Sequence, residues 1–186
     1  FYYFTGYHDH LAVRHDAPSS FALITRDEKQ PISIIMNQFI YYFCVADSNF
    51  QWPSDVYLFT GWDKKILDNN KNEERSKQEP TPSSPFIFTD KKQAPQSSIE
   101  KNRLEKLNIA LENIPESADA EWALTKAIRN NGLEKSTIGI DHPVIKKVIT
   151  SSGLNINTID GDHAIRKIRV IKTPREIELM RITAEN

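Results

Sequence analysis

"STIGIDHPVIKKVITSSGLNINTI", residues 136–159, has the pattern of a strand, a helix and a second strand in close succession. The apolar run at 136–140 predicts a buried strand, and Asp141 is placed to cap the helix that follows it. Pro143 suits the first turn of that helix, and Gly153 suits its end. The expected apolar face of the helix consists of Val144, Ile145, Val148 and Ile149.

Residues 154–159 alternate imperfectly between apolar and polar side chains and predict the second strand. Two strands that are joined by a crossover of this length form a parallel pair, because a tight hairpin turn joins only antiparallel strands. We therefore expect an α/β domain with a mixed β-sheet flanked by helices. One such domain suits a chain of 186 residues.

Two further helices are predicted before this unit. Ser97 and Glu100 have the spacing of a capping box, and an apolar side chain then recurs at helical spacing until Pro115 ends the run. The second helix covers 117–132, with Ser117 available as its cap and Gly132 placed to end it.

The first third of the chain has the composition of strands. Residues 20–25 and 32–36 are short β-rich runs on either side of a polar segment, which predicts a hairpin of adjacent strands. Residues 56–60 and 86–89 are further candidate strands. For 37–47 the pattern favours a helix capped by Asn37, although its aromatic and β-branched residues also permit a strand.

A polar segment interrupts this apolar pattern at about 64–84. It contains almost no apolar side chains to offset the entropy lost when a chain is ordered. We expect it to be a mobile surface excursion in which Glu73, Glu74 and Arg75 are solvated charges.

Charge and composition exclude several classes of partner. The 24 basic and 25 acidic residues nearly cancel, so no overall field favours nucleic acid or an anionic membrane. No stretch approaches the roughly 20 apolar residues of a membrane span, and the beginning of the chain lacks the basic region of a signal peptide. The single cysteine, Cys44, cannot form an internal disulfide, which favours a reducing compartment and hence the cytoplasm.

The motifs of several enzyme classes are absent from the sequence. It contains no glycine-rich phosphate loop, no cysteine set for a zinc knuckle and no nucleophile elbow. The densest group of functional side chains is "YHDHLAVRHD" at 7–16, with His8, His10 and Arg14 as candidate substrate contacts. A solvated polar loop, a loop that faces an anion or substrate, and a metal site all fit this segment.

The end of the sequence, "VIKTPREIELMRITAEN" at 170–186, begins a well-formed helix. Thr173, Pro174 and Glu176 supply a cap, a first-turn proline and a capping box, and Ile177, Met180 and Ala184 follow as an apolar stripe. Neither a glycine nor a proline ends this helix. We expect the polypeptide to continue beyond Asn186, and the lack of an initiator methionine suggests the same for the other end.

Two separated segments carry a resemblance to a known family. "FYYFTGY" at 1–7 resembles the aromatic-Thr-Gly segment of the amino-terminal domain of creatinase, prolidase and Xaa-Pro aminopeptidase, the pita-bread metallohydrolases. "IRKIRVIKTPREIELMRITAEN" at 165–186 is similar to the segment that leaves that domain, and "STIGID" at 136–141 to its last strand-helix unit. Residues 37–98 do not align, and the helix and strand that precede the aromatic segment in the family have no counterpart in this chain.

The resemblance implies a creatinase/prolidase-type amino-terminal domain at 1–172 and the start of a connector helix at 173–186. It also implies that two Asp, one His and two Glu in a following catalytic domain hold two divalent metal ions, Mn, Co or Zn. No catalytic residue and no metal ligand is then expected in this chain. The intact protein is expected to be a homodimer or higher homo-oligomer that acts on a peptide or small amide, with this domain covering a neighbouring subunit's active site.

Two alternatives stay open beside this reading. The chain can belong to a catalytically silent relative in which it serves assembly or binding. It can also be a free-standing α/β binding domain that uses residues 7–16.

Overall fold

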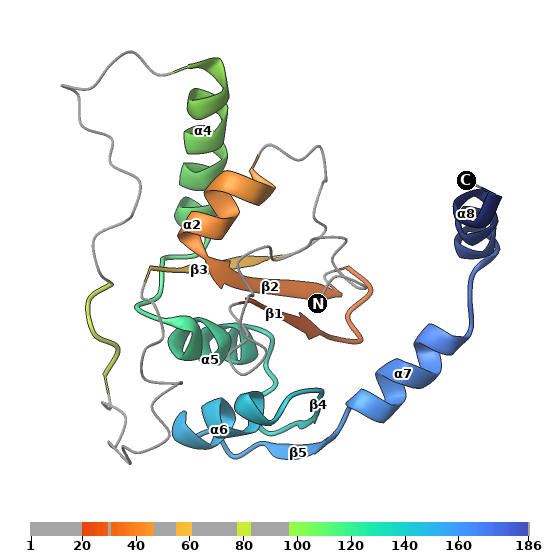
Figure 1. Ribbon diagram of the computed structural model, residues 1–186. Coiled ribbons are helices and arrows are strands. Elements are labelled where there is room, and N and C mark those ends of the chain that lie inside the picture. The colour runs from red at the N-terminus through yellow and green to blue at the C-terminus, as the bar shows by residue number, and fades with distance from the viewer. Residues whose placement is uncertain (1–19, 30, 47–54, 61–77, 83–96, 186) are drawn as a thin grey trace.

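The computed structural model describes residues 20–29, 31–46, 55–60, 78–82 and 97–185 as a mixed α/β structure (Figure 1). Strands β1 (Ser20–Ile24), β2 (Ile32–Asn37) and β3 (Val56–Phe59) form a small mixed sheet in the order β1-β2-β3. β1 pairs antiparallel with β2, which confirms the hairpin, and β3 runs parallel to β2.

A second sheet contains β4 (Thr137–Ile140) and β5 (Asn157–Asp160), which pair in parallel as the crossover predicts. The expected single sheet is therefore divided into two within the described residues. β4 is also less buried than predicted, because its residues alternate between partly buried and exposed positions. β5 begins at Asn157 and not at Leu154.

Helices cover both faces of the first sheet (Figure 1). On one face, Ile35 and Tyr57 pack into a core with α5 (Ala120–Asn130), and this core extends to α6 (Pro143–Ser151). On the other face, Met36 and Leu58 pack with α2 (Gln38–Ile40) and α4 (Ser98–Asn113). The three-layer arrangement follows from the alternation of side chains along each strand.

The caps of these helices confirm some predictions and correct others. Asn37 caps α2, which continues as a π-helical turn at Tyr41–Val45, so the helical alternative for 37–47 is correct. The capping box of Ser97 and Glu100 is present at the start of α4, with both reciprocal hydrogen bonds formed.

Two predicted caps are wrong. Asp119, and not Ser117, caps α5 by accepting the Trp122 N–H at 2.9 Å. Ser117 instead extends the first sheet, since its N–H donates to the Leu58 carbonyl. His142, and not Asp141, caps α6 through Nδ1, which accepts the Val144 N–H at 3.3 Å.

Two helices complete the described chain, α7 (Asp162–Val170) and α8 (Pro174–Glu185). α7 was not predicted, and His163 lies exposed on it. The candidate strand at 86–89 and most of the 64–84 segment lie outside the described residues. Within that segment, 78–82 are described.

The β4–β5 pair brings two glycines into close contact. A Cβ atom built on Gly161 would lie 2.8 Å from the Gly139 carbonyl carbon and 2.9 Å from the Ile140 nitrogen. Backbone atoms cannot move aside as a flexible side chain can, so this position admits only glycine without a shift of the strand.

We predict that Gly161→Ala destabilises the protein by about 2–3 kcal/mol, because the added methyl group forces β4 and β5 apart. Gly153→Ala is the matched control. Gly153 has a φ of 70° with nothing near its Cβ position, so only the dihedral penalty of about 1 kcal/mol applies. Urea unfolding measures the loss of stability in each of the two variants. A Gly161→Ala variant that is no less stable than Gly153→Ala would contradict the steric argument.

Candidate functional site

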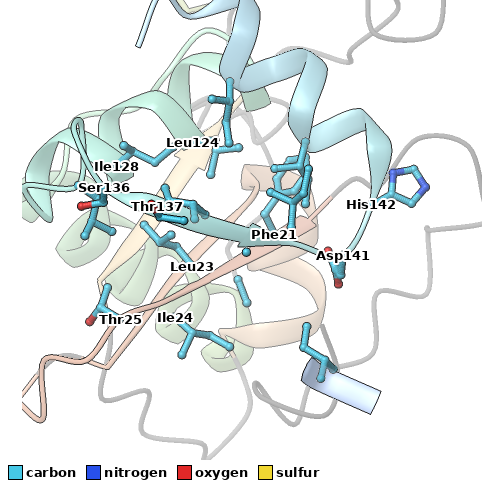
Figure 2. A pocket seen from close by; sticks show the side chains of 18 of the residues that line it. Phe21, Leu23, Ile24, Thr25, Leu124, Ile128, Ser136, Thr137, Asp141 and His142 are labelled. Carbon is cyan, nitrogen blue, oxygen red and sulfur yellow. The ribbon is translucent and has the colours of Figure 1, made fainter. Parts of the chain in front are cut away.

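An open groove of about 740 Å³ lies between β1 of the first sheet and β4 of the second (Figure 2). Its walls include β1, β4, the start of α6 and one side of α5. The lining is mainly apolar, with contributions from Phe21, Leu23, Ile24, Leu124, Ile128, Ile138, Ile140 and Ile145. Polar side chains lie toward the two ends of the groove, with Thr25 and Ser136 near one end and Asp141 and His142 near the other.

The backbone of β1 presents a hydrogen-bonding edge to this groove. The Thr25 N–H donates to the Pro31 carbonyl at 2.9 Å. This hydrogen bond shows which residues of β1 use their backbone groups to bond to β2. In an antiparallel pair every second residue bonds to the partner strand, and the residues between point the other way. The N–H and C=O groups of Ala22 and Ile24 therefore point away from β2, toward the groove.

β4 presents a second edge from the opposite side. The carbonyls of Ser136 and Ile140 accept hydrogen bonds from Asn157 and Gly161. By the same alternation, the backbone groups of Thr137 and Gly139 point away from β5 and into the groove. The groove is thus bounded by two strand edges, and its polar groups are largely main-chain amides and carbonyls.

The three predicted substrate contacts, His8, His10 and Arg14, lie outside the described residues. In the part of the chain that the structure describes, no group of three or more His, Cys, Asp or Glu side chains is placed to hold a metal ion. The described groove can bind an extended apolar chain through its strand edges. Sequence reasoning missed it, since no motif marks two edges that are more than a hundred positions apart.

A cluster of partly buried charged side chains lies near the beginning of α5. Glu79 Oε1 accepts the Ala118 N–H at 3.0 Å, and its Oε2 lies 3.8 Å from Lys126 Nζ. Lys126 also donates to the Pro115 carbonyl at 2.9 Å. These contacts hold part of the polar 64–84 segment against the beginning of α5.

Glu116 belongs to the same cluster. Its Oε1 is buried, with no hydrogen-bond partner among the described groups. Burial raises the pKa of Glu116 to about 7, and the nearby Lys126 ammonium opposes that rise. Glu116 is not marked by any sequence pattern, because its environment is created by the packing of distant segments.

Comparison with known proteins gave no match to a protein-family model, to a curated protein or to a solved structure. Among the described helices, none has both the length and the apolar content that crossing a bilayer requires.

We predict that Glu116→Gln removes a pH-dependent part of the folding free energy. The folded-state pKa is raised, so Glu116 favours the folded state most at low pH, and this contribution is lost as pH rises from about 4.5 to about 7. Gln mimics the protonated carboxyl. The variant should therefore be more stable than the parent at pH 8 by about 1 kcal/mol, allowing for solvent screening at a half-buried site.

Urea unfolding at pH 5 and pH 8 tests this prediction. Glu112→Gln, at an exposed position on α4, is the control for the removal of one carboxyl group. Equal pH profiles for the parent and Glu116→Gln would contradict the assignment.

Proposed function

We propose that this chain is the non-catalytic amino-terminal domain of a metal-dependent Xaa-Pro dipeptidase- or aminopeptidase-like hydrolase. In this proposal it supports the assembly of a homo-oligomer and covers the active site of a neighbouring subunit. The two divalent metal ions and their five ligands belong to a catalytic domain that follows Asn186. The substrate is a peptide or a small amide whose carbonyl the metals polarise.

The observation that carries the proposal is the exposed apolar surface of α8. The exposed fractions of Ile177, Met180 and Val170 are 41%, 59% and 76%. Together with Ala184 they line a shallow groove between α8 and the end of α7. A helix of twelve residues is marginal in water without tertiary packing, so this face requires a partner surface.

The beginning of α8 is well defined, which supports its role as a connector. The Glu176 N–H donates to Thr173 Oγ1 at 3.2 Å, and the Thr173 N–H donates to Glu176 Oε2 at 2.8 Å. These hydrogen bonds lower the pKa of the Glu176 carboxyl. The capping box fixes where the chain turns from α7 into the helix that the family resemblance identifies with the connector.

A free-standing α/β binding domain is the second candidate, and the groove between β1 and β4 favours it. The third candidate is an assembly domain of a catalytically silent relative. The described residues would have the same features in that domain as in the domain of an active hydrolase. The coding sequence downstream of Asn186 separates the three. An open reading frame with two Asp, one His and two Glu in the family's arrangement supports the hydrolase, and the same frame without these ligands supports the silent relative. An immediate stop codon supports the free-standing domain.

We predict that α8 packs on the following domain through its Met180 face. In the intact protein, Met180→Asp should lower stability by about 2 kcal/mol or more, because it buries an unpaired charge. Leu179→Asp is the matched control, since Leu179 is 53% exposed and does not line the groove that Ile177, Met180 and Ala184 share. Thermal unfolding compares the two, and equal effects would contradict the proposed orientation.

We also predict that the 7–16 segment positions substrate in the intact enzyme. His8→Ala, His10→Ala and Arg14→Ala should each cost about 1.5–3 kcal/mol where a charge-assisted contact is lost, seen mainly as a raised KM. Kinetics on an Xaa-Pro dipeptide measure this, with metal content and oligomer size unchanged. If all three variants keep the kinetics of the parent, the segment is only a solvated surface. If a histidine variant loses metal, the histidines are metal ligands.

A further inference from the structure

Residues 78–82 are attached to the beginning of α5 through the side chain of Glu79. Its Oε1 atom accepts the Ala118 N–H at 3.0 Å, and its Oε2 atom lies 3.8 Å from Lys126 Nζ. The side chains of Lys126 and Glu79 are only 25% and 28% exposed, so solvent screens this ion pair less than one at the open surface. Glu79 therefore joins the segment both to a backbone amide and to an ammonium group.

Lys126 also lies beside a second carboxyl group, that of Glu116. Its Nζ atom donates to the Pro115 carbonyl at 2.9 Å and to the Glu116 carbonyl at 3.5 Å. Among the described groups, none hydrogen-bonds to the buried Oε1 atom of the Glu116 side chain. A buried carboxylate oxygen without a partner is costly once it carries charge. An ionised Glu116 therefore competes for the Lys126 ammonium.

The competition for Lys126 involves two carboxyl groups, those of Glu79 and Glu116. Lys126 is the cation whose charge acts on the Glu116 side chain, because it opposes the rise of the Glu116 pKa that burial causes. Neighbouring acidic side chains have other partners or are exposed. They are Asp119, which accepts the Trp122 N–H, Glu121, which accepts the Ser151 hydroxyl, and the exposed Glu112 on α4.

We propose that Lys126 is shared between Glu79 and Glu116, so that ionisation of Glu116 weakens the attachment of residues 78–82 to the beginning of α5. When Glu116 is protonated, Lys126 pairs with Glu79, and Glu79 also keeps its hydrogen bond to the Ala118 N–H. When Glu116 is ionised, its carboxylate takes the ammonium as partner. Glu79 then keeps only the hydrogen bond to Ala118, and the segment leaves the helix more often.

The change takes place near neutral pH. Burial raises the pKa of Glu116 to about 7, so the carboxyl group is protonated below this pH and ionised above it. Residues 78–82 are therefore held more tightly in mildly acidic solution than in mildly basic solution. The coupling is reciprocal: if an ionised Glu116 weakens the attachment of Glu79, then the attached Glu79 raises the pKa of Glu116 by the same factor.

Hydrogen exchange of the Ala118 amide tests the proposal on the isotope-labelled parent chain. Nuclear magnetic resonance gives its exchange rate, which is divided by the intrinsic rate at the same pH to give a protection factor. We expect protection to fall about fivefold between pH 5 and pH 9, the upper end of what a partly exposed ion pair contributes. The midpoint should coincide with the titration of the Glu116 carboxyl carbon. The Ser117 amide, which bonds to the Leu58 carbonyl, should not follow this titration.

Glu116→Gln supplies the second test, because glutamine mimics the protonated carboxyl and cannot ionise. We expect the Ala118 amide of this variant to keep its low-pH protection up to pH 9. Glu112→Gln is the matched control, since it removes an exposed carboxyl group from α4, and it should keep the fall in protection that the parent shows.

Glu79→Gln tests the reciprocal effect. This variant retains an oxygen that can accept the Ala118 N–H but has no charge to pair with Lys126. We expect the midpoint of the Glu116 titration to fall by about 0.7 on the pH scale, which is the same factor of about five.

Three results would each overturn the proposal. The first is protection of the Ala118 amide that stays constant in the parent while Glu116 titrates. The second is a fall in protection that persists in Glu116→Gln, because another group would then be responsible. The third is a Glu116 midpoint that is the same in Glu79→Gln as in the parent, because the two carboxyl groups would then not share Lys126.

Discussion

The alternation of side chains along β2 is the constraint on which the rest of the described structure depends. Ile34 and Met36 point to one face of the first sheet and Ile35 to the other, and all three are almost completely buried. A central strand that is apolar on both faces is stable only when a helical layer covers each face. The places of α4 and α5 follow from this requirement. β3 adds apolar side chains to both cores, and β1 adds Phe21 and Leu23 to the core that α5 covers.

Local chemistry explains which parts of the fold could be predicted from sequence. The hairpin of β1 and β2, the box of Ser97 and Glu100, and the glycine ends of α5 and α6 depend on residues within a few positions of one another. Ser117 has the side chain of a cap, yet its N–H bonds to Leu58, a residue far away in sequence. The prediction for the start of α5 was therefore wrong because a tertiary contact, which local helix propensity does not include, determines the role of Ser117.

The same distinction between local sequence signals and long-range contacts applies to the candidate functional sites. The side chains of His8, His10 and Arg14 are conspicuous in the sequence, and they lie outside the described residues. The groove between β1 and β4 and the environment of the half-buried Glu116 are defined by packing between segments far apart in the chain. Backbone edges have no residue signature, and a raised carboxyl pKa depends on solvent exclusion by neighbours. Neither feature has a motif from which it could have been inferred.

The position of α5 on the first sheet also bears on the order in which the chain acquires its structure. β1 and β2 are close in sequence and can pair as soon as both have been synthesised, yet Ile35 and Tyr57 are buried by a helix that follows much later. Contacts of such high sequence separation form slowly, because a long loop must close before they contribute. During synthesis the sheet therefore keeps one apolar face uncovered until α5 has emerged from the ribosome. Over that interval the uncovered apolar face leaves the nascent chain open to aggregation.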